Sequence, residues 1–324
     1  MPPAPPSTPA AAAAPWPPGR IPALPPWLHP LQHLALALLA GAAAWSPTGA
    51  PSWRLLALAA AIETVALART LTARPAPARI AAGDVAALLL LALLVWQAGS
   101  VHLGLFDPLL VPPPEVVLKL FASELPVMLT GLGGSLALLA GGFGLALLVA
   151  VPLGLAIGWR RRAFHAVNPF TKVLGTIPPV VYIPYAIHFL PSFKTASVLV
   201  IFIGAFWPLF INTLSGVFNI PAGLIDSARV LGLRPRTMLL RVILPAALPS
   251  ICTGATLALC FSFLMLTAAE VIGGSSGIGW YVNNFADFAD YPRVIVGILF
   301  IAIVVTAITW ATERLERHLL RWRN

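Results

Sequence analysis

The sequence carries little charge. Asp, Glu, Lys and Arg make up 10% of its 324 residues, whereas hydrophobic residues make up 59% and the mean hydropathy is +0.89. Soluble domains carry about 25% charged residues, so this composition excludes an ordinary soluble domain and predicts an integral membrane protein. The net charge of +9 does not indicate nucleic-acid binding, because the basic residues lie between apolar runs and form no single basic face.

Cysteine and clustered ligand residues are also scarce. The two cysteines, Cys252 and Cys260, lie in one apolar segment and are expected to be small core residues. No CxxC motif or Cys/His cluster indicates a metal site, and no cofactor is predicted. The acids are scattered and the histidines isolated. This pattern disfavours an integral membrane enzyme, which needs a clustered constellation at the membrane face.

Proline, by contrast, is concentrated at the N-terminus. Residues 1–30 hold 12 of the 33 prolines. At this density proline blocks helix formation and favours extended, solvated chain. The segment has no uninterrupted apolar run of the kind found in a cleaved signal peptide. We therefore expect residues 1–30 to form a disordered tail.

Long apolar runs follow this tail. A spanning helix needs about 20 mostly apolar residues, and eight segments come close to this length or exceed it. The fourth has 32 residues, which would cover roughly 48 Å at about 1.5 Å per residue, so it is expected to begin as an interfacial piece. The candidate spans are 31–46, 52–68, 84–100, 127–158, 174–191, 195–216, 251–271 and 294–311.

The basic residues are distributed unevenly between the two sides that these spans define. With the N-terminus in the cytoplasm, sixteen Lys and Arg residues lie inside and four lie outside. Because cytoplasmic loops carry the excess of Lys and Arg, this bias predicts a multi-pass protein with both termini in the cytoplasm. The four outside residues are Arg54, Lys119, Lys194 and Arg293.

One predicted cytoplasmic loop, 221–249, is too polar to span a bilayer and too apolar to be a flexible linker. Pro221 suits the first turn of a helix, and this helix is expected to run from Ala222 to Leu231. Its apolar residues fall along one side at helical spacing. They are Leu224, Ile225, Ala228 and Leu231.

A glycine and three prolines divide the rest of this loop. Gly232 follows the expected helix end, where a left-handed residue is common. A second amphipathic helix is predicted from Pro235 to Val242, and Pro245 and Pro249 mark the entry to the next span. Four interpretations of this helix–turn–helix remain open from spacing alone: it lies among lipid headgroups, packs on its own bundle, binds nucleic acid, which is the least favoured, or docks on a partner.

The loop resembles the EAA loop of bacterial ABC-importer permeases. That pattern is Glu-Ala-Ala, then Gly, then a hydrophobic pair and Pro, and Asp226-Ser227-Ala228, Gly232 and Ile243-Leu244-Pro245 match it. Asp stands here for Glu and Ser for Ala, which conserves charge or size. The resemblance implies a coupling helix that docks into a cleft on an ATPase subunit. The residues it assigns to this coupling are Leu224, Asp226, Ser227, Ala228, Arg229, Gly232, Leu233, Arg236 and Pro245.

The resemblance covers about 84–324 and is densest from residue 174 onward. The stretch 268–299 and the end of the chain, 313–324, are similar to the branch that handles sulfonates, taurine and nitrate. One departure is Ser135-Leu136-Ala137, because that branch often has Arg after Ser-Leu. The implied fold is all-α and membrane-integral, with about eight transmembrane helices. It has a six-helix type I permease core over 84–324 and an additional N-terminal hairpin with a basic loop over 31–83.

Four residues are candidates for a translocation pathway. Pro178 and Pro179 are expected to disturb a helix in mid-membrane, either as a kink or as a broken helix that lines a cavity. Asn212 is expected to hydrogen-bond across helices. Glu270 matches the family's Ala-Glu, and an ionisable residue inside a span is functional by default. Two roles remain open for Glu270, lining the pathway or pairing internally.

A stripe of small residues lies in the fourth candidate span, with successive members four positions apart. Such a stripe permits close approach of another helix. It either packs within the chain or forms the seam between two permease subunits. Its members are Gly142, Ala146, Ala150, Gly154 and Gly158.

The leading interpretation is the permease subunit of an ABC importer in a bacterial cytoplasmic (inner) membrane. Residues 273–279 are rich in glycine, but the chain contains no Gly-Lys pair and therefore no Walker A loop. The resemblance implies separate ATPase subunits, a periplasmic or lipid-anchored solute-binding protein and a second permease copy. It also implies a small solute, with an anion such as a sulfonate, taurine or nitrate expected.

A proton-coupled secondary transporter is the alternative. Such a transporter needs ionisable residues in mid-membrane, and Glu63 in the second candidate span is one. Glu63 is otherwise expected to snorkel or to pair with Arg54. ATP dependence of uptake separates the two interpretations.

Overall fold

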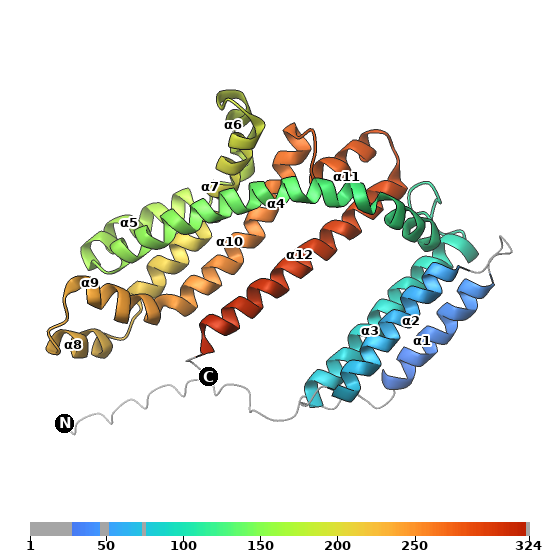
Figure 1. Ribbon diagram of the computed structural model, residues 1–324, viewed down its shortest axis with the longest axis horizontal. Helices are drawn as coiled ribbons and strands as arrows, with labels where there is room; N and C mark the ends of the chain where they lie inside the picture. The colour runs from blue at the N-terminus through green and yellow to red at the C-terminus, as the bar shows by residue number, and fades with distance from the viewer. Residues whose placement is uncertain (1–27, 46–51, 73–75, 322–324) are drawn as a thin grey trace, which may run out of the picture. The chain divides into compact units, whose positions relative to one another are not determined.

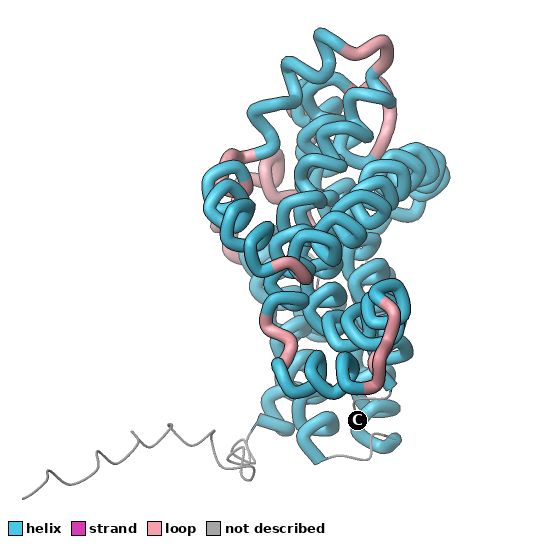
Figure 2. The backbone as a smooth tube through the Cα atoms, turned by 90° about the vertical axis from the view of Figure 1, so that its left-hand side faces the viewer, coloured by secondary structure: helices cyan, strands magenta, loops and turns pink. Residues whose placement is uncertain are grey.

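The computed structural model describes residues 28–45, 52–72 and 76–321. Every regular element in these ranges is helical (Figure 2), as the sequence predicts. The chain divides into two compact units, Met1–Leu118 and Lys119–Asn324. Most of the predicted tail, up to residue 27, lies outside the described residues, and the first helix begins at Leu28.

The first unit contains a bundle of three helices (Figure 1). α1 (Leu28–Ala44), α2 (Trp53–Thr72) and α3 (Ala76–Gln97) pack against one another, and α3 continues as the π-helical segment η1 (Ala98–His102). The helices meet through alanines and leucines, which let them approach closely. These core residues are Ala35, Leu39, Ala43, Leu55, Ala59 and Leu90.

Glu63 on α2 is held by α1 and not by Arg54. Its carboxylate accepts a 2.6 Å hydrogen bond from Gln32 Nε2 and lies 2.9 Å from His33 Nδ1. Arg54 pairs instead with Glu115, at 3.1 Å. The predicted pairing is wrong because nine residues along one helix separate the two side chains by about 13.5 Å.

The second unit begins within α4 (Pro114–Gly158), whose first five residues belong to the first unit. At about 1.5 Å per residue its 45 residues cover roughly 68 Å, so it is longer than the predicted span and exceeds the bilayer core. The other helices are α5 (Arg161–Leu174), η2 (Pro179–Tyr182), α6 (Ile183–Phe189), α7 (Phe193–Phe218), α8 (Ala222–Val230), α9 (Pro235–Met238), η3 (Leu239–Ile243), α10 (Leu244–Gly273), α11 (Ile278–Asp287) and α12 (Tyr291–Leu319).

The small-residue stripe of α4 packs on α7, which is the first of its two predicted uses. A methyl group added at any of three glycines would come within 2.8 Å of an α7 side chain. Because residue numbers rise together along both helices, α4 and α7 run parallel. The pairs are Gly142 with Ile201, Gly154 with Thr213, and Gly158 with Val217.

The chain between α4 and α7 must therefore return to the other end of the unit, and it does so in two pieces. Phe164 of α5 stacks on Phe218 at the end of α7, with ring centroids 3.8 Å apart. Ile187 of α6 instead lies beside Gly273, close to Phe193 at the start of α7. The crossing is made by α5 and then by η2 and α6, with the break at 175–178.

This broken crossing corrects the predicted span 174–191, which is not a single helix, whereas the predicted count of eight spans is not confirmed. Pro178, Pro179 and Pro184 lack the N–H groups that a continuous helix needs, so the segment is not one spanning helix. In the described part of the chain, six helices are long and apolar enough to span a membrane, and α1 is shorter. The six are α2, Ala82–His102, α4, α7, Pro235–Gly273 and α12.

Candidate functional site

The turn after α8 has the backbone that its sequence predicts. Gly232 has a φ of +67°. Its N–H donates to Arg229 O at 2.9 Å, and the next N–H, of Leu233, donates to Ala228 O at 3.4 Å. These are the two bonds of a Schellman motif. A methyl group at Gly232 would meet no atom within 4 Å. Glycine is therefore favoured here by the positive φ and not by a lack of room for a side chain.

The helix after this turn is continuous with the next span. α9 begins at Pro235, passes through the π-helical η3 and continues as α10 to Gly273. The predicted helix Pro235–Val242 and the next span therefore form one continuous helix, which Pro245 and Pro249 do not interrupt. The wider π turn, in which Leu244 N–H donates to Leu239 O, adapts the helix to the proline that follows it.

The apolar residues of α8 and of the turn after it are divided between two faces. Ala228 is buried, and Ile225 and Leu233 pack beside it on the core of the unit. Leu224, Val230 and Leu231 remain 46%, 88% and 76% exposed. The predicted single apolar side is thus split, and we call the three exposed residues the apolar tip. An exposed apolar patch with a polar rim is typical of an interaction site.

The rim of the apolar tip is basic. Arg229, Arg234, Arg236 and Arg241 are all exposed. Asp226 pairs with Arg229 at 3.0 Å, but both side chains are more than half exposed, so the pair contributes at most about 1 kcal/mol. Ser227 Oγ donates to Gly223 O at 2.8 Å and stays within its own helix.

Glu270, at the other end of the unit, is fully buried. Its carboxylate accepts hydrogen bonds from Ser135 Oγ on α4, at 2.5 Å, and from Gly279 N–H at 2.7 Å. Ser135 Oγ in turn accepts from Ile278 N–H at 3.1 Å. The carboxylate therefore caps the start of α11 and joins it to α4 and α10, which corresponds to the internal pairing left open above.

The glycine-rich segment before α11 is shaped around this carboxylate. Gly277 has a φ of +118°, and a methyl group there would lie 2.3 Å from a Glu270 carboxylate oxygen. Both the positive φ and the lack of room for a side chain therefore require glycine at this position. This accounts for Gly277 in the segment that superficially resembles a phosphate loop.

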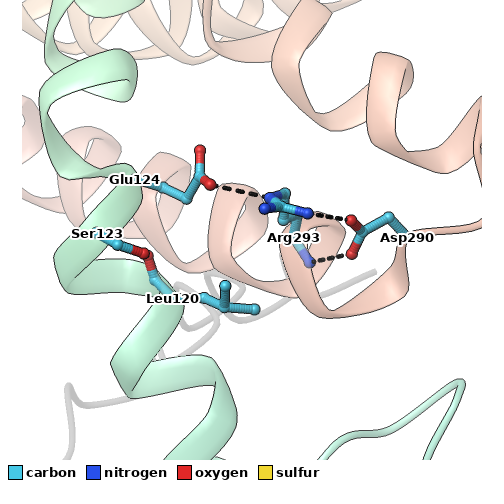
Figure 3. Close-up of polar contacts among 5 residues, drawn as sticks. All are labelled: Leu120, Ser123, Glu124, Asp290 and Arg293. Carbon is cyan, nitrogen blue, oxygen red and sulfur yellow. Dashed lines mark hydrogen bonds and ion pairs between the residues drawn. The ribbon is translucent and has the colours of Figure 1, made fainter.

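A second polar group joins α4 to the start of α12 (Figure 3). Arg293 Nε donates to Glu124 Oε1 at 2.9 Å, and a guanidinium NH donates to Asp290. Asp290 also accepts from the Arg293 N–H at 3.3 Å as the helix cap. Burial, and then the nearby Glu124 carboxylate, raise the pKa of Tyr281, so its hydroxyl stays protonated. The Asp-Tyr-Pro-Arg helix start is readable from sequence, but its Glu124 partner is not.

The remaining pathway candidates do not join Glu270 in one hydrogen-bonded group. Pro178 and Pro179 lie at the break between α5 and η2, which is the predicted broken helix. Asn212 Nδ2 donates to Pro208 O on its own helix, at 2.8 Å, and not across helices. The carbonyl that accepts this bond belongs to Pro208, which itself has no N–H group to donate along the helix.

Known proteins share sequence similarity with much of this chain. Residues 150–321 match the family described as "Binding-protein-dependent transport system inner membrane component". The putative aliphatic sulfonates transport permease protein SsuC of Bacillus subtilis is 33% identical over 78% of this chain and 92% of that protein. The nitrate import permease protein NrtB of Leptolyngbya laminosa is 36% identical over 53% of this chain and 62% of that protein.

Two further similarities agree with these matches. The bicarbonate transport system permease protein CmpB of Synechococcus elongatus is 33% identical over 58% of this chain and 68% of that protein. Among solved structures, the inward-facing MetNI methionine ABC transporter matches with a TM-score of 0.53, over 61% of this chain and 98% of that chain. At 19% identity the latter shows the fold alone.

Proposed function

Because this chain belongs to the family of binding-protein-dependent transport system inner membrane components, we propose that it is the permease subunit of an ATP-driven importer for a small anion. The observation that carries this proposal is the 221–249 loop, with its apolar tip, basic rim and fixed glycine turn. A separate ATPase subunit receives the tip in an apolar cleft. Its acidic groups face Arg229, Arg234 and Arg236.

The packing of α8 supports its role as a lever. Ile225 and Ala228 pack on a core formed with α7 and α10, and the chain after the Gly232 turn continues into the spanning helix α10. Packed interiors transmit displacement because they have few voids. ATP-driven closure of two ATPase subunits moves the two α8 loops together, and this movement passes into the spans and opens the pathway outward.

The solute is a small oxyanion. The similar proteins are named for aliphatic sulfonates, nitrate and bicarbonate, which share a small, negatively charged oxygen-bearing group. A periplasmic or lipid-anchored binding protein delivers the solute to the end of the unit that holds Glu270 and Arg293. A second copy of this chain completes the pathway, to which Pro178, Pro179, Asn212 and Glu270 contribute. The chain lies in the cytoplasmic membrane with both termini inside.

The proton-coupled alternative has less support. Glu63 lies in the first unit, where Gln32 and His33 satisfy its carboxylate. The family match, by contrast, begins at residue 150 and includes the whole 221–249 loop.

Affinity purification tests the proposed docking. Leu231→Asp puts a charge on the apolar tip without disturbing the core, because Leu231 is 76% exposed. Burying an unpaired carboxylate in an apolar cleft costs several kcal/mol. We expect an ATPase subunit with a Walker A motif to copurify with the wild type and to be depleted at least roughly tenfold with Leu231→Asp, as measured by mass spectrometry.

Phe288→Asp provides the matched control. Phe288 is also 76% exposed, but it follows α11 at the other end of the unit. This variant should retain the ATPase at the wild-type level. Absence of any ATPase from the intact wild-type complex would contradict the proposed function, and equal retention by Leu231→Asp would contradict the assigned docking residues.

A further inference from the structure

A cavity of about 460 Å³ lies where α4 and α7 end and α8 begins. Its walls include Trp159 after α4, Arg161 at the start of α5, and Asp226 and Arg229 on α8. This volume falls within the range of small-molecule sites, roughly 300–1,000 Å³. The cavity is separate from the apolar tip and from the Glu270 group.

The charges of this cavity do not balance. Asp226 and Arg229 form an ion pair at 3.0 Å, which leaves one unpaired positive charge on the wall, because the structure shows no ion pair for Arg161 within the described ranges. Arg160 and Arg162 flank it. The first turn of α5 contains no acid, and no side chain caps it. The start of a helix is its positive end, so its dipole adds to this excess of positive charge.

We propose that this cavity binds a phosphate group, held by Arg161 and Arg229. Guanidinium groups bind phosphate oxygens through paired, charge-assisted hydrogen bonds. Asp226 neutralises only one of the two arginines, so a monoanionic phosphate gains a net attraction. Two sources share this chemistry, the headgroup of an anionic phospholipid and free phosphate from the cytosol.

The position of the cavity gives the bound group a regulatory consequence. Arg161 belongs to the broken crossing, whereas Arg229 belongs to α8, and a phosphate held between them ties the two elements together. This part of the inference rests on the proposed function, because it assigns α8 to ATPase coupling. The binding itself does not depend on that assignment.

Native mass spectrometry of the purified full-length chain tests the binding. The probes are phosphatidylglycerol, which is anionic, and phosphatidylcholine, which has no net charge. Arg161→Gln removes the unpaired positive charge from the wall of the cavity. Arg162→Gln is the matched control, because Arg162 is exposed, adjacent and equally charged but does not line the cavity.

We expect the wild type and Arg162→Gln to retain phosphatidylglycerol in preference to phosphatidylcholine. Arg161→Gln should bind phosphatidylglycerol roughly tenfold more weakly, which corresponds to the loss of one charge-assisted contact. A second arm adds inorganic phosphate to the delipidated chain. Thermal stabilisation that requires Arg161, without retention of phosphatidylglycerol, identifies free phosphate as the source and also supports the proposal.

Equal binding of both probes by the wild type and Arg161→Gln would overturn the proposal. Equal losses of phosphatidylglycerol binding in Arg161→Gln and Arg162→Gln would also overturn it, because they would indicate a general attraction between the lipid and the positively charged surface. If neither probe binds and Arg161→Gln instead depletes the ATPase, the cavity receives an ATPase carboxylate and the proposal is wrong. Because binding is measured on the chain alone, its failure is distinguishable from failure of the copurification.

Discussion

Glu270 illustrates how a charged side chain persists inside this apolar protein. An unsatisfied buried carboxylate is among the costliest groups in a folded protein. Glu270 has no exposed surface, but Ser135 and Gly279 donate to its two oxygens. The donors come from α4 and from the start of α11, so one side chain fixes three elements at the same end of the unit.

Substitutions at Glu270 should separate the contribution of its charge to stability from the contribution of its hydrogen bonds. Glu270→Ala leaves Gly279 N–H and Ser135 without their acceptor, and each buried unsatisfied donor costs about 1–3 kcal/mol. Glu270→Gln retains an acceptor and should lose less stability. Thermal unfolding in detergent measures both, and Ser135→Ala combined with Glu270→Ala completes a double-mutant cycle. Additive losses would show that the two side chains are not coupled.

Residue conformations set by local sequence were predictable, whereas partners distant in sequence were not. The left-handed Gly232 follows from its place after an amphipathic helix, and the structure confirms it. The partner of Glu270, Ser135, lies 135 residues away, and the partner of Arg293, Glu124, lies 169 residues away. Only the folded arrangement of α4 beside the later helices brings these pairs together.

The contact between α4 and α7 shows what small residues achieve between two elements. Gly154→Val should drive the helices apart, because even its Cβ would lie 2.7 Å from Thr213. Overpacking of this kind costs about 1–3 kcal/mol. Gly144→Val on the same helix is the control, because its Cβ would meet no atom within 4 Å. Thermal unfolding of the two variants measures the difference, and equal melting temperatures would contradict the assigned contact.

The long apolar run of α7 was predicted closely, although one proline, Pro208, lies inside it. The α7 region was predicted as 195–216 and found as Phe193–Phe218. The 174–191 segment was misread because its composition is apolar enough to span, whereas its prolines divide it into short pieces. α5 was not predicted, because its arginines, histidine and proline obscure an amphipathic helix whose Phe164 is buried.

Across the second unit, contacts distinguish two ends. Gly158, Phe218 and α8 meet at one end, around the 460 Å³ cavity. Ser135, Glu270 and the Arg293 group mark the other. The excess of arginine lies at the first end, which the distribution of Lys and Arg predicts to be cytoplasmic. Because α4 and α7 run parallel, the segment between them must cross the membrane although no single helix in it is long enough.

Cysteine labelling tests that crossing directly. His165 on α5 and His188 on α6 are both exposed, and the broken crossing puts them on opposite sides. In a background with Cys252→Ala and Cys260→Ala, His188→Cys should react with a membrane-impermeant maleimide in cells with a permeable outer envelope. His165→Cys should react only after the inner membrane is opened. Labelling of both from one side would refute the broken crossing, whereas the reverse pattern would preserve the crossing and invert the orientation.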